Sequence, residues 1–328
     1  MINKLLAVAA IWLNLEVFAQ ESSASEPPLK EILMVEVDKE QLLARLKTWP
    51  EDPSQARELM TFRVAIGKKE GDKQKEGDHK TPEGIYFTQT IIDGKTLPAK
   101  YGSNAIPIDF PNSYDRFLKK TGYGIWLHGV EKDRRISAAK VTEGCVAFYN
   151  TDIEFLSDWL KPHQAVVVIG KNAHSLNQPR VLSSVRKETT KWLESWQSRD
   201  IDAYIGFYDS QFRHKGRSLD HYRGYKQRVF KSYNEMKVEF SSLRVFGHEN
   251  YAVAIANQDF DGDGRYRSEG RKVLFWNKQP DGSWKILVEL FDSRRLRATE
   301  YSNLELSKLA QISPSRHLES EVKKVERF

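Results

Sequence analysis

One stretch of the chain contains the two side chains that thiol-based acyl transfer requires. Cys145 is the only cysteine in 328 residues, and His128 lies 17 residues before it. A thiol attacks a carbonyl as its thiolate, and an imidazole within hydrogen-bonding reach is the usual means of forming one at neutral pH. We therefore predict a Cys/His acyl-transfer site, with a buried and chemically inert cysteine as the alternative.

The local sequence indicates how the two side chains come together. His128 follows the apolar run GIWL and Cys145 lies in the β-rich run GCVAF, so each is at the end of an expected strand. The loop between them is long enough to bring the two strands side by side. Gly144 allows a tight turn that can point the amide of Cys145 at a developing oxyanion, and Thr142 adds a hydroxyl nearby.

The first 19 residues have the layout of a secretory signal peptide. Lys4 gives a positive start, residues 5–13 are apolar, and residues 17–19 end in a small residue suited to cleavage. The apolar run is about half of the ~20 residues that a spanning helix needs, so cleavage is favoured over a permanent anchor. No cysteine directly follows the cleavage site, which excludes a bacterial lipoprotein. We predict a periplasmic protein, in which a single cysteine has no partner for an internal disulfide.

The composition is that of ordinary globular protein. Apolar residues make up 40% of the chain and charged residues 29%, and the formal net charge is +6. The length suggests about two domains. Because the positive charge is modest and spread along an exported chain, we expect a partner such as anionic cell wall or membrane surface, and no nucleic acid.

The first predicted domain is mainly β. Residues 61–170 alternate short β-rich runs with Gly- and Pro-bearing loops, which predicts a β catalytic domain with short helices, one of them over 151–160. Residues 20–60 are predicted to be an N-terminal linker and a helical segment. Apolar residues recur there at helical spacing, at Leu42, Leu43, Leu46 and Trp49.

A second domain follows a linker at 171–180. Residues 181–297 begin with a long amphipathic helix ending near Ser198 and a shorter helix, and continue with four strand-like runs, which predicts an α+β unit. Residues 298–328 are expected to be a charged, peripheral tail of helical propensity. We expect the aromatic side chains at the start of this domain to be core rather than ligand-binding: Trp192, Trp196, Tyr204, Phe207 and Tyr208.

Two separated motifs resemble the L,D-transpeptidase (YkuD) family. His-Gly at 128–129 followed by TEGCV at 142–146 is similar to the family signature of His-Gly, a spacer, and Ser/Thr-His-Gly-Cys. Residues 77–86 resemble its Gly-Asp…Thr-Pro-Glu-Gly-Ile-Tyr segment. The resemblance covers roughly residues 30–170. It implies a β-sandwich-like catalytic domain that acts on the stem peptides of peptidoglycan.

The resemblance also implies a role for each matching residue. Cys145 would be the nucleophile, His128 the base, and the carbonyl of Gly129 would hold the imidazole tautomer. The amides around Gly144 and Cys145 would form the oxyanion hole. The attacked carbonyl would be that of the L-centre of meso-diaminopimelate, with D-alanine leaving and the thioester passing to an amine or to water.

Two positions depart from the family pattern. Glu143 replaces the usual second histidine, and Ala147 replaces an arginine often found two residues after the cysteine. An ionised carboxylate close to the sulfur would raise the pKa of the thiol. We therefore expect Glu143 to point away, or to meet a substrate cation such as the diaminopimelate ammonium. Loss of the arginine removes a bidentate anchor.

The second domain resembles the opening of an NTF2-like domain, a cone of helices against a bent sheet with a pocket. This domain order is similar to that of the cell-shape-determining L,D-carboxypeptidases of curved and helical proteobacteria. The resemblance leaves open the choice between transpeptidase and carboxypeptidase outcomes, the ligand of the NTF2-like pocket, and a homodimer. A non-catalytic peptidoglycan-binding protein, in which Glu143 has disabled the site, is the rival hypothesis.

Three further side chains are candidates for substrate binding. Trp126 shares a strand face with His128, so it either stacks on the substrate or packs. Tyr101 lies in a loop that can cap the cleft, and Lys80 lies in the segment that borders the site in the family.

No metal site is expected. The stretch DFDGDGRYRSEG at 259–270 begins like a calcium loop but has glycine where the bidentate glutamate belongs, so we predict a hairpin turn. The histidines other than His128 show no metal-ligand spacing, and there is no second cysteine, so neither zinc nor another cofactor is predicted.

Overall fold

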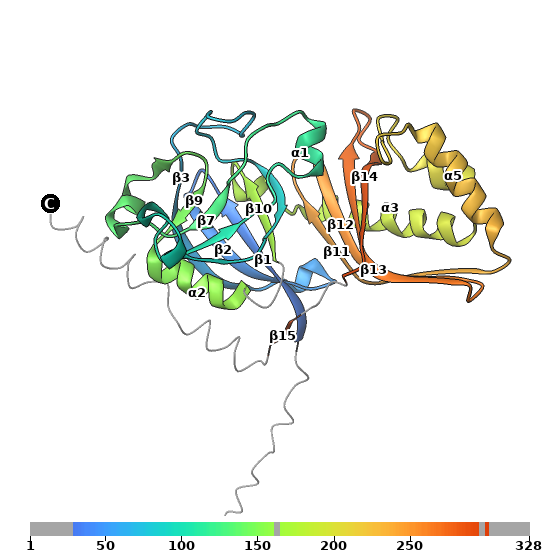
Figure 1. The fold of residues 1–328 in the computed structure, drawn as a ribbon, viewed down its shortest axis with the longest axis horizontal. Coiled ribbons are helices and arrows are strands. Elements are labelled where there is room, and N and C mark those ends of the chain that lie inside the picture. Colours follow the sequence, from blue (N-terminus) through green and yellow to red (C-terminus); the bar gives the residue numbers. More distant parts are fainter. Residues whose placement is uncertain (1–28, 161–164, 295–298, 302–328) are drawn as a thin grey trace, which may run out of the picture.

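Two domains lie side by side in the computed structural model, which describes residues 29–160, 165–294 and 299–301 (Figure 1). The N-terminal domain is mainly β with short helices, and the C-terminal domain is α+β, as predicted. The predicted signal peptide and residues 302–328 of the predicted tail lie outside the described residues. Among the helices that are described, none has the length and apolarity needed to cross a membrane.

The N-terminal domain is built on one eleven-stranded sheet. Its strands run in the order β4-β10-β1-β2-β3-β9-β7-β6-β5, with β15 paired to β1 and β8 paired to β3. The strands are β1 (Leu29–Asp38), β2 (Leu43–Trp49), β3 (Glu58–Gly67), β4 (Gly84–Phe87), β5 (Ile92–Asp93), β6 (Asn104–Pro107), β7 (Trp126–His128), β8 (Lys140–Thr142), β9 (Val146–Phe148), β10 (Val166–Gly170) and β15 (Thr299–Tyr301). The helices are α1 (Ser113–Phe117), α2 (Asn150–Leu160) and the 3-10 turns η1 (Pro53–Gln55), η2 (Gly94–Thr96), η3 (Ala99–Tyr101), η4 (Asp133–Ala138) and η5 (Ala173–Ser175). The helix predicted over 151–160 is thus confirmed as α2.

The predicted helical segment within residues 20–60 is wrong, because β2 is a strand in the middle of the sheet. It pairs antiparallel with β1 on one side and with β3 on the other. Ala44, Leu46 and Thr48 are fully buried at alternate positions, whereas Lys47 between them pairs with Glu36 of β1 at 2.8 Å. This period of two is that of a strand with one buried face. The leucine spacing that suggested a helix comes from residues on both faces.

The start of the predicted tail is also a strand. Residues 299–301 form β15, which pairs antiparallel with residues 29–31 of β1. Those three residues of β1 extend beyond its pairing with β2 and β10, which begins further along the strand. Their backbone groups need partners, and β15 supplies them.

The two strands that carry the candidate site are neighbours. β7 and β9 pair in parallel, with Leu127 opposite Val146 and His128 opposite Ala147. Leu127 and Val146 are fully buried in the core of this domain. Because side chains alternate along a strand, His128 and Cys145 lie on the other face together. The predicted pairing of the His and Cys strands is therefore present.

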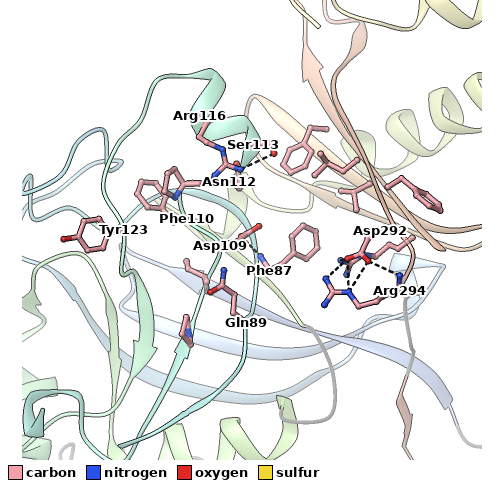
Figure 2. A pocket seen from close by; sticks show the side chains of 18 of the residues that line it. Phe87, Gln89, Asp109, Phe110, Asn112, Ser113, Arg116, Tyr123, Asp292 and Arg294 are labelled. Carbon is pink, nitrogen blue, oxygen red and sulfur yellow. Dashed lines mark hydrogen bonds and ion pairs between the residues drawn. The ribbon is translucent and has the colours of Figure 1, made fainter. Parts of the chain in front are cut away.

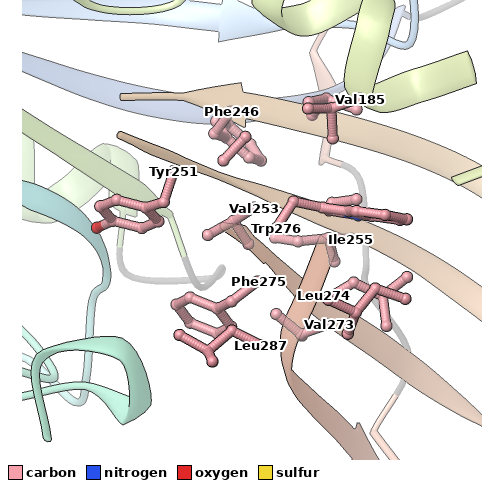
Figure 3. Close-up of a cluster of buried hydrophobic side chains, with 14 of the residues drawn as sticks. Val185, Phe246, Tyr251, Val253, Ile255, Val273, Leu274, Phe275, Trp276 and Leu287 are labelled. Atoms are coloured by element: carbon pink, nitrogen blue, oxygen red, sulfur yellow. The ribbon is translucent and has the colours of Figure 1, made fainter. Parts of the chain in front are cut away.

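The C-terminal domain packs helices against an antiparallel sheet. The helices are α3 (Pro179–Gln197), α4 (Ile201–Gly206) and α5 (Leu219–Ser232), and the strands, in sheet order, are β11 (Met236–Gly247), β12 (Tyr251–Gly262), β13 (Tyr266–Lys278) and β14 (Trp284–Asp292). α3 ends beside Ser198 as predicted, although it begins at Pro179, within the predicted linker. The predicted hairpin at 259–270 is confirmed as the turn between β12 and β13. Figure 3 shows the buried side chains that these strands contribute.

The aromatic side chains of the two predicted helices belong to this core. Four of them are buried, and the fifth packs against the cluster at its edge. The buried ones are Trp192, Trp196, Tyr204 and Tyr208, and the fifth is Phe207. Their predicted role as core residues is confirmed.

The two domains share a packed and hydrogen-bonded boundary. Trp49 donates its indole N–H to the carbonyl of Val245 at 3.0 Å, and its ring stacks on Phe246 at 5.7 Å between centroids. Tyr114 stacks on Tyr251 with ring centroids 4.1 Å apart. One buried apolar cluster runs across this boundary. The surfaces that the domains present to each other are therefore fixed by packing.

Candidate active site

The thiol of Cys145 is nearly buried and held by backbone groups. Its residue is 9% exposed, Sγ donates to the carbonyl of Gly124 at 3.4 Å, and the backbone amide of Trp126 donates to the sulfur. Burial raises the pKa of the thiol to about 11, although the Trp126 amide and the Lys100 ammonium lower it. The resting sulfur is therefore a neutral thiol at physiological pH.

The imidazole of His128 is also neutral at rest. His128 is 5% exposed, and its Nδ1 contacts the carbonyl of Gly129, the atom that was expected to hold the tautomer. With the proton on Nδ1, Nε2 is a proton acceptor. Burial lowers the pKa of His128 to about 4, although the Gly129 carbonyl raises it. The ring can accept a proton throughout the neutral range.

The two groups share a face but are not bonded to each other in this state. Strand pairing places Ala147 opposite His128, and Cys145 lies two residues earlier on the same face. Such diagonal neighbours are roughly 8 Å apart at their Cα atoms. Within the described part of the chain, no hydrogen bond joins the thiol to the imidazole. Transfer of the thiol proton to Nε2 therefore requires the sulfur and the imidazole to approach each other from these resting positions.

The turn before Cys145 is held by threonine hydroxyls. Thr142 donates to the carbonyl of Cys145 at 2.7 Å and accepts from the amide of Gly144 at 3.2 Å. Thr81 also donates to the Cys145 carbonyl, at 3.5 Å. The amide of Gly144 is thus engaged inside the turn, which corrects its expected place in an oxyanion hole. Thr142 and Gly144 shape the turn, and the amide of Cys145 is the remaining expected donor.

Only glycine fits at position 144. Its φ of +133° is one that side-chain-bearing residues rarely adopt, and a Cβ there would lie 2.8 Å from the carbonyl oxygen of Lys80. Lys80 therefore borders the site with its backbone. Its ammonium lies beside Gly71, so the structure does not bring the Lys80 side chain to the sulfur.

The segment at 77–86 acts as scaffolding for this turn. Lys39 is buried and donates to the carbonyl of Thr81 and to the carboxylate of Glu83, each at 2.8 Å. Thr81 in turn accepts from the amide of Gly67 at 2.9 Å. The role of Thr81 was missed from the sequence, although it is part of the Thr-Pro-Glu-Gly motif. The sequence feature that could have indicated this role is the hydroxyl of Thr81, which lies in the loop between β3 and β4.

Tyr101 and Trp126 line the imidazole. The Tyr101 ring lies 5.1 Å from the His128 ring in an edge-on arrangement and 4.7 Å from the ring of Trp126. Trp126 and His128 therefore do share a face of β7, and the Tyr101 loop covers both. The ammonium of Lys100 lies 5.0 Å from the Tyr101 ring centroid and lowers the pKa of both Cys145 and His128. Lys100 was not singled out in the sequence.

Asn150 holds the loop that follows His128. Its Oδ1 accepts from the amides of Ser103 at 3.0 Å and Val130 at 3.3 Å, and its Nδ2 donates to the carbonyl of Val130 at 2.7 Å. A Cβ on Gly129 would lie 2.3 Å from that Oδ1, so the close approach requires glycine. This role of Asn150 could not be predicted from the sequence, in which the residue only marks the start of α2.

The two departures from the family pattern occupy different surroundings. The Glu143 side chain is 70% exposed and lies 4.0 Å from the ammonium of Lys68, and its charge raises the pKa of the Cys145 thiol. Ala147 is fully buried opposite His128, and its methyl group offers no anchor for a substrate.

A groove lies between the two domains, and Figure 2 shows side chains that line it. The groove has a volume of about 930 Å³. Gly124 and Trp126, the residues that hold the thiol, lie in its wall. The opposite wall comes from β13 and β14 of the C-terminal domain, including Arg271 and Asp292. A substrate in this groove would touch both domains.

The C-terminal domain has a second cavity, of about 370 Å³, around a buried charged cluster. Lys272 contacts Glu289 at 2.6 Å, and the hydroxyls of Tyr208 and Tyr222 donate to the same carboxylate at 2.7 Å. Burial would raise the pKa of Glu289, but the ammonium groups of Lys272 and Lys226 hold it at about 2. Among the residues described, no three metal-binding side chains gather in this cavity or elsewhere.

Comparisons with known proteins find matches to both domains. Residues 34–169 match the family model of the L,D-transpeptidase catalytic domain (YkuD), and residues 184–290 match that of the Cds6 C-terminal NTF2-like domain. The structure of Bd1075 from Bdellovibrio bacteriovorus is similar with a TM-score of 0.68 and 26% identity, over 84% of this chain and 96% of that one. The helical cell shape determining protein Pgp2 from Campylobacter jejuni is similar in fold, with a TM-score of 0.65 and 23% identity, over 80% of this chain and 92% of that one.

A curated relative matches part of the N-terminal domain. YafK of Escherichia coli (strain K12), which is named as a candidate L,D-transpeptidase, is 36% identical over 84 residues. The match covers 26% of this chain and 29% of that relative's length.

Proposed function

Because the chain joins an L,D-transpeptidase domain of the YkuD family to a C-terminal NTF2-like domain, we propose that it is an exported, cysteine-dependent acyltransferase that acts on peptidoglycan stem tetrapeptides. The observation that carries the proposal is the placement of its one thiol. Cys145 and His128 lie on one face of two paired strands, and Gly124 and Trp126, whose backbone groups contact the thiol, line a groove large enough for a peptide. Periplasmic location rests on the signal-peptide layout of residues 1–19.

The reaction would start from a neutral pair. Substrate entry turns the thiol from the carbonyl of Gly124 toward His128, whose Nε2 accepts its proton. Sγ then bonds to the carbonyl carbon of the diaminopimelate L-centre, and the oxyanion accepts a hydrogen bond from the amide of Cys145. The imidazolium returns the proton to the departing amine of D-alanine, which leaves a thioester. Water or an amine attacks this thioester and releases the thiol.

The role that we infer is cell-wall remodelling with an effect on cell shape. It is supported by likeness to a protein described as determining helical cell shape and by the shared two-domain fold. Hydrolysis to a tripeptide and transfer to an amine differ only in which nucleophile reaches the thioester. Both are outcomes of the same acyl-enzyme.

Analysis of muropeptide products tests this proposal. The purified mature protein, incubated with tetrapeptide muropeptides, is expected to release D-alanine, and Cys145→Ala is expected to release none. Tripeptide products identify carboxypeptidase action, whereas new cross-links or exchange of D-amino acids identify transfer. D-alanine release by the Cys145→Ala protein at the wild-type rate would refute the nucleophile assignment.

A non-catalytic peptidoglycan-binding protein is the second candidate. One observation favours it, which is the neutral thiol without a hydrogen bond to His128. This candidate predicts that the protein binds purified sacculi and that neither wild type nor Cys145→Ala changes their muropeptides. If wild type and Cys145→Ala bind sacculi equally but only the wild type changes the muropeptides, the protein is an enzyme.

A further inference from the structure

Each wall of the interdomain groove carries charges of both signs, and one carboxylate of the N-terminal wall lies across from one guanidinium of the C-terminal wall. Asp109 lies on the N-terminal side, just after β6, and Arg271 lies across from it on β13. The two groups are close enough for their charges to interact. Aromatic rings, including Phe87 and Phe110, lie beside the carboxylate. A ligand with one positive and one negative end would satisfy both walls.

Asp109 is fixed by the strand beside it. Its Oδ1 accepts from the amide of Phe87 at 2.8 Å, and its own amide donates to the carbonyl of Phe87 at 3.1 Å. The side chain is only partly exposed. Burial raises the pKa of Asp109 to about 6. A carboxylate in this position is stabilised in its charged form when a cation binds next to it.

Arg271 is fixed on the other wall. Its side chain is 12% exposed, its guanidinium carbon lies 5.7 Å from the centroid of the Phe87 ring, and one of its nitrogens donates to Asp292 at 3.2 Å. A guanidinium presents five donors in a plane, so one that already meets a carboxylate can still bind another. The contact with the Phe87 ring keeps the guanidinium at the groove.

We propose that Asp109 and Arg271 form a subsite for an amino-acid zwitterion, with the ammonium on Asp109 and the carboxylate on Arg271. Resting on the proposed function, this subsite would bind the free D-centre at the end of the diaminopimelate side chain, while the L-centre carbonyl lies at Cys145. The NTF2-like domain would then bind the substrate of the catalytic domain directly, through Arg271.

The spacing of the sheet is compatible with this placement. Trp126 lies level with Cys145 on one side and pairs with Pro107 on the other, and Asp109 follows Pro107 by two residues. Two strand spacings and two residues separate the Cα atoms of Asp109 and Cys145 by about 12 Å. A spacer of three methylene groups, which is about 5 Å long at 1.5 Å per bond, fits within that distance.

Binding to the inactive protein tests the subsite separately from catalysis. The probes are two tetrapeptides that carry meso-diaminopimelate or L-lysine at the third position, because lysine keeps the ammonium and lacks the carboxylate. The Cys145→Ala protein is expected to bind the diaminopimelate peptide about 10- to 100-fold more tightly, as expected for a charged hydrogen-bonded contact. Adding Arg271→Met should weaken binding of the diaminopimelate peptide to the level of the lysine peptide. Binding of the lysine peptide should not change. Adding Asp109→Asn should weaken both.

Arg294→Met is the matched control, because Arg294 also pairs with Asp292 at the groove but its side chain is 84% exposed. The protein with this substitution should still prefer the diaminopimelate peptide over the lysine peptide. Equal binding of both peptides by Cys145→Ala, an unchanged preference after Arg271→Met, or an unchanged affinity for both peptides after Asp109→Asn overturns the subsite. Turnover by the protein with Cys145 intact is a separate readout, so an inactive enzyme that keeps this preference contradicts only the proposed function.

Discussion

The pH dependence of thiol alkylation is the most quantitative consequence of the resting site. Iodoacetamide reacts with the thiolate, and burial raises the pKa of Cys145 to about 11, compared with ~8.5 for a free cysteine. At pH 7.5 this difference lowers the thiolate fraction about 300-fold. A thiolate of higher pKa is more nucleophilic, which raises the alkylation rate of the thiolate about 10- to 20-fold. Cys145 should therefore react about 20-fold more slowly than a free thiol.

The single cysteine makes the assay unambiguous. Labelling rates are measured by intact mass between pH 6 and 11, and the same protein in guanidinium chloride serves as the unfolded reference. The folded rate should still be rising at pH 10, whereas the unfolded rate should level off above about pH 9. Lys100→Gln should slow labelling further, because the Lys100 ammonium lowers the pKa of the thiol.

His128→Ala provides the sharper comparison. Because the resting imidazole is neutral and is not bonded to the sulfur, its removal should leave the alkylation profile unchanged while abolishing turnover. A resting thiolate–imidazolium pair would give an alkylation rate with an inflection at or below pH 8.5 in the wild type. That inflection would move to higher pH in His128→Ala. That result would refute the neutral-pair reasoning.

Four further outcomes follow from named contacts. The acid limb of kcat/KM should lie near pH 4, because His128 must be neutral to accept the proton and its pKa is about 4; a limb near 6.5 would contradict the effect of burial. Thr142→Val should lower the free energy of unfolding by about 1–3 kcal/mol through loss of its bonds to the Cys145 carbonyl and the Gly144 amide, and Thr142→Ser should restore most of it. Equal stability of the two variants would count against that role. Glu289 has its pKa lowered from ~4.3 to about 2, so it contributes about 3 kcal/mol that is present above pH 4.3 and lost as the pH falls through 2. Urea unfolding of Glu289→Gln should lack that loss, and an identical pH profile would contradict it. Trp49→Ala should cost about 3–5 kcal/mol at the domain boundary, measured by urea unfolding, and a cost below about 1 kcal/mol would mean that the boundary is not well packed.

Local sequence patterns predicted most of the elements and the pair at the centre of the site. The apolar run before His128 and the β-rich run after Gly144 each formed a strand, and those strands are neighbours. The long amphipathic helix and four strands of the second domain were also predicted correctly. β2 was not, because its last residue, Trp49, lies on the face opposite Leu46, and apolar residues taken from both faces have a spacing that resembles that of a helix.

Contacts between distant parts of the chain could not be predicted. Thr81 reaches the carbonyl of Cys145, and Asn150 reaches the loops around residues 103 and 130, only because the sheet brings these segments together. The charge of Lys100 at the site depends on how its loop folds over β7. The interdomain groove arises from side chains more than 100 positions apart in sequence, such as Asp109 and Arg271, and depends on how the domains pack.

The most direct test of the central claim is a rapid-quench mass measurement. The mature protein is mixed with excess meso-diaminopimelate tetrapeptide, quenched in acid within milliseconds to seconds, and digested. We expect the peptide containing Cys145 to gain the mass of the tripeptide acyl group, with an equal amount of D-alanine released in the same interval. D-alanine release at the full rate with Cys145 never modified, and undiminished in Cys145→Ala, would contradict it.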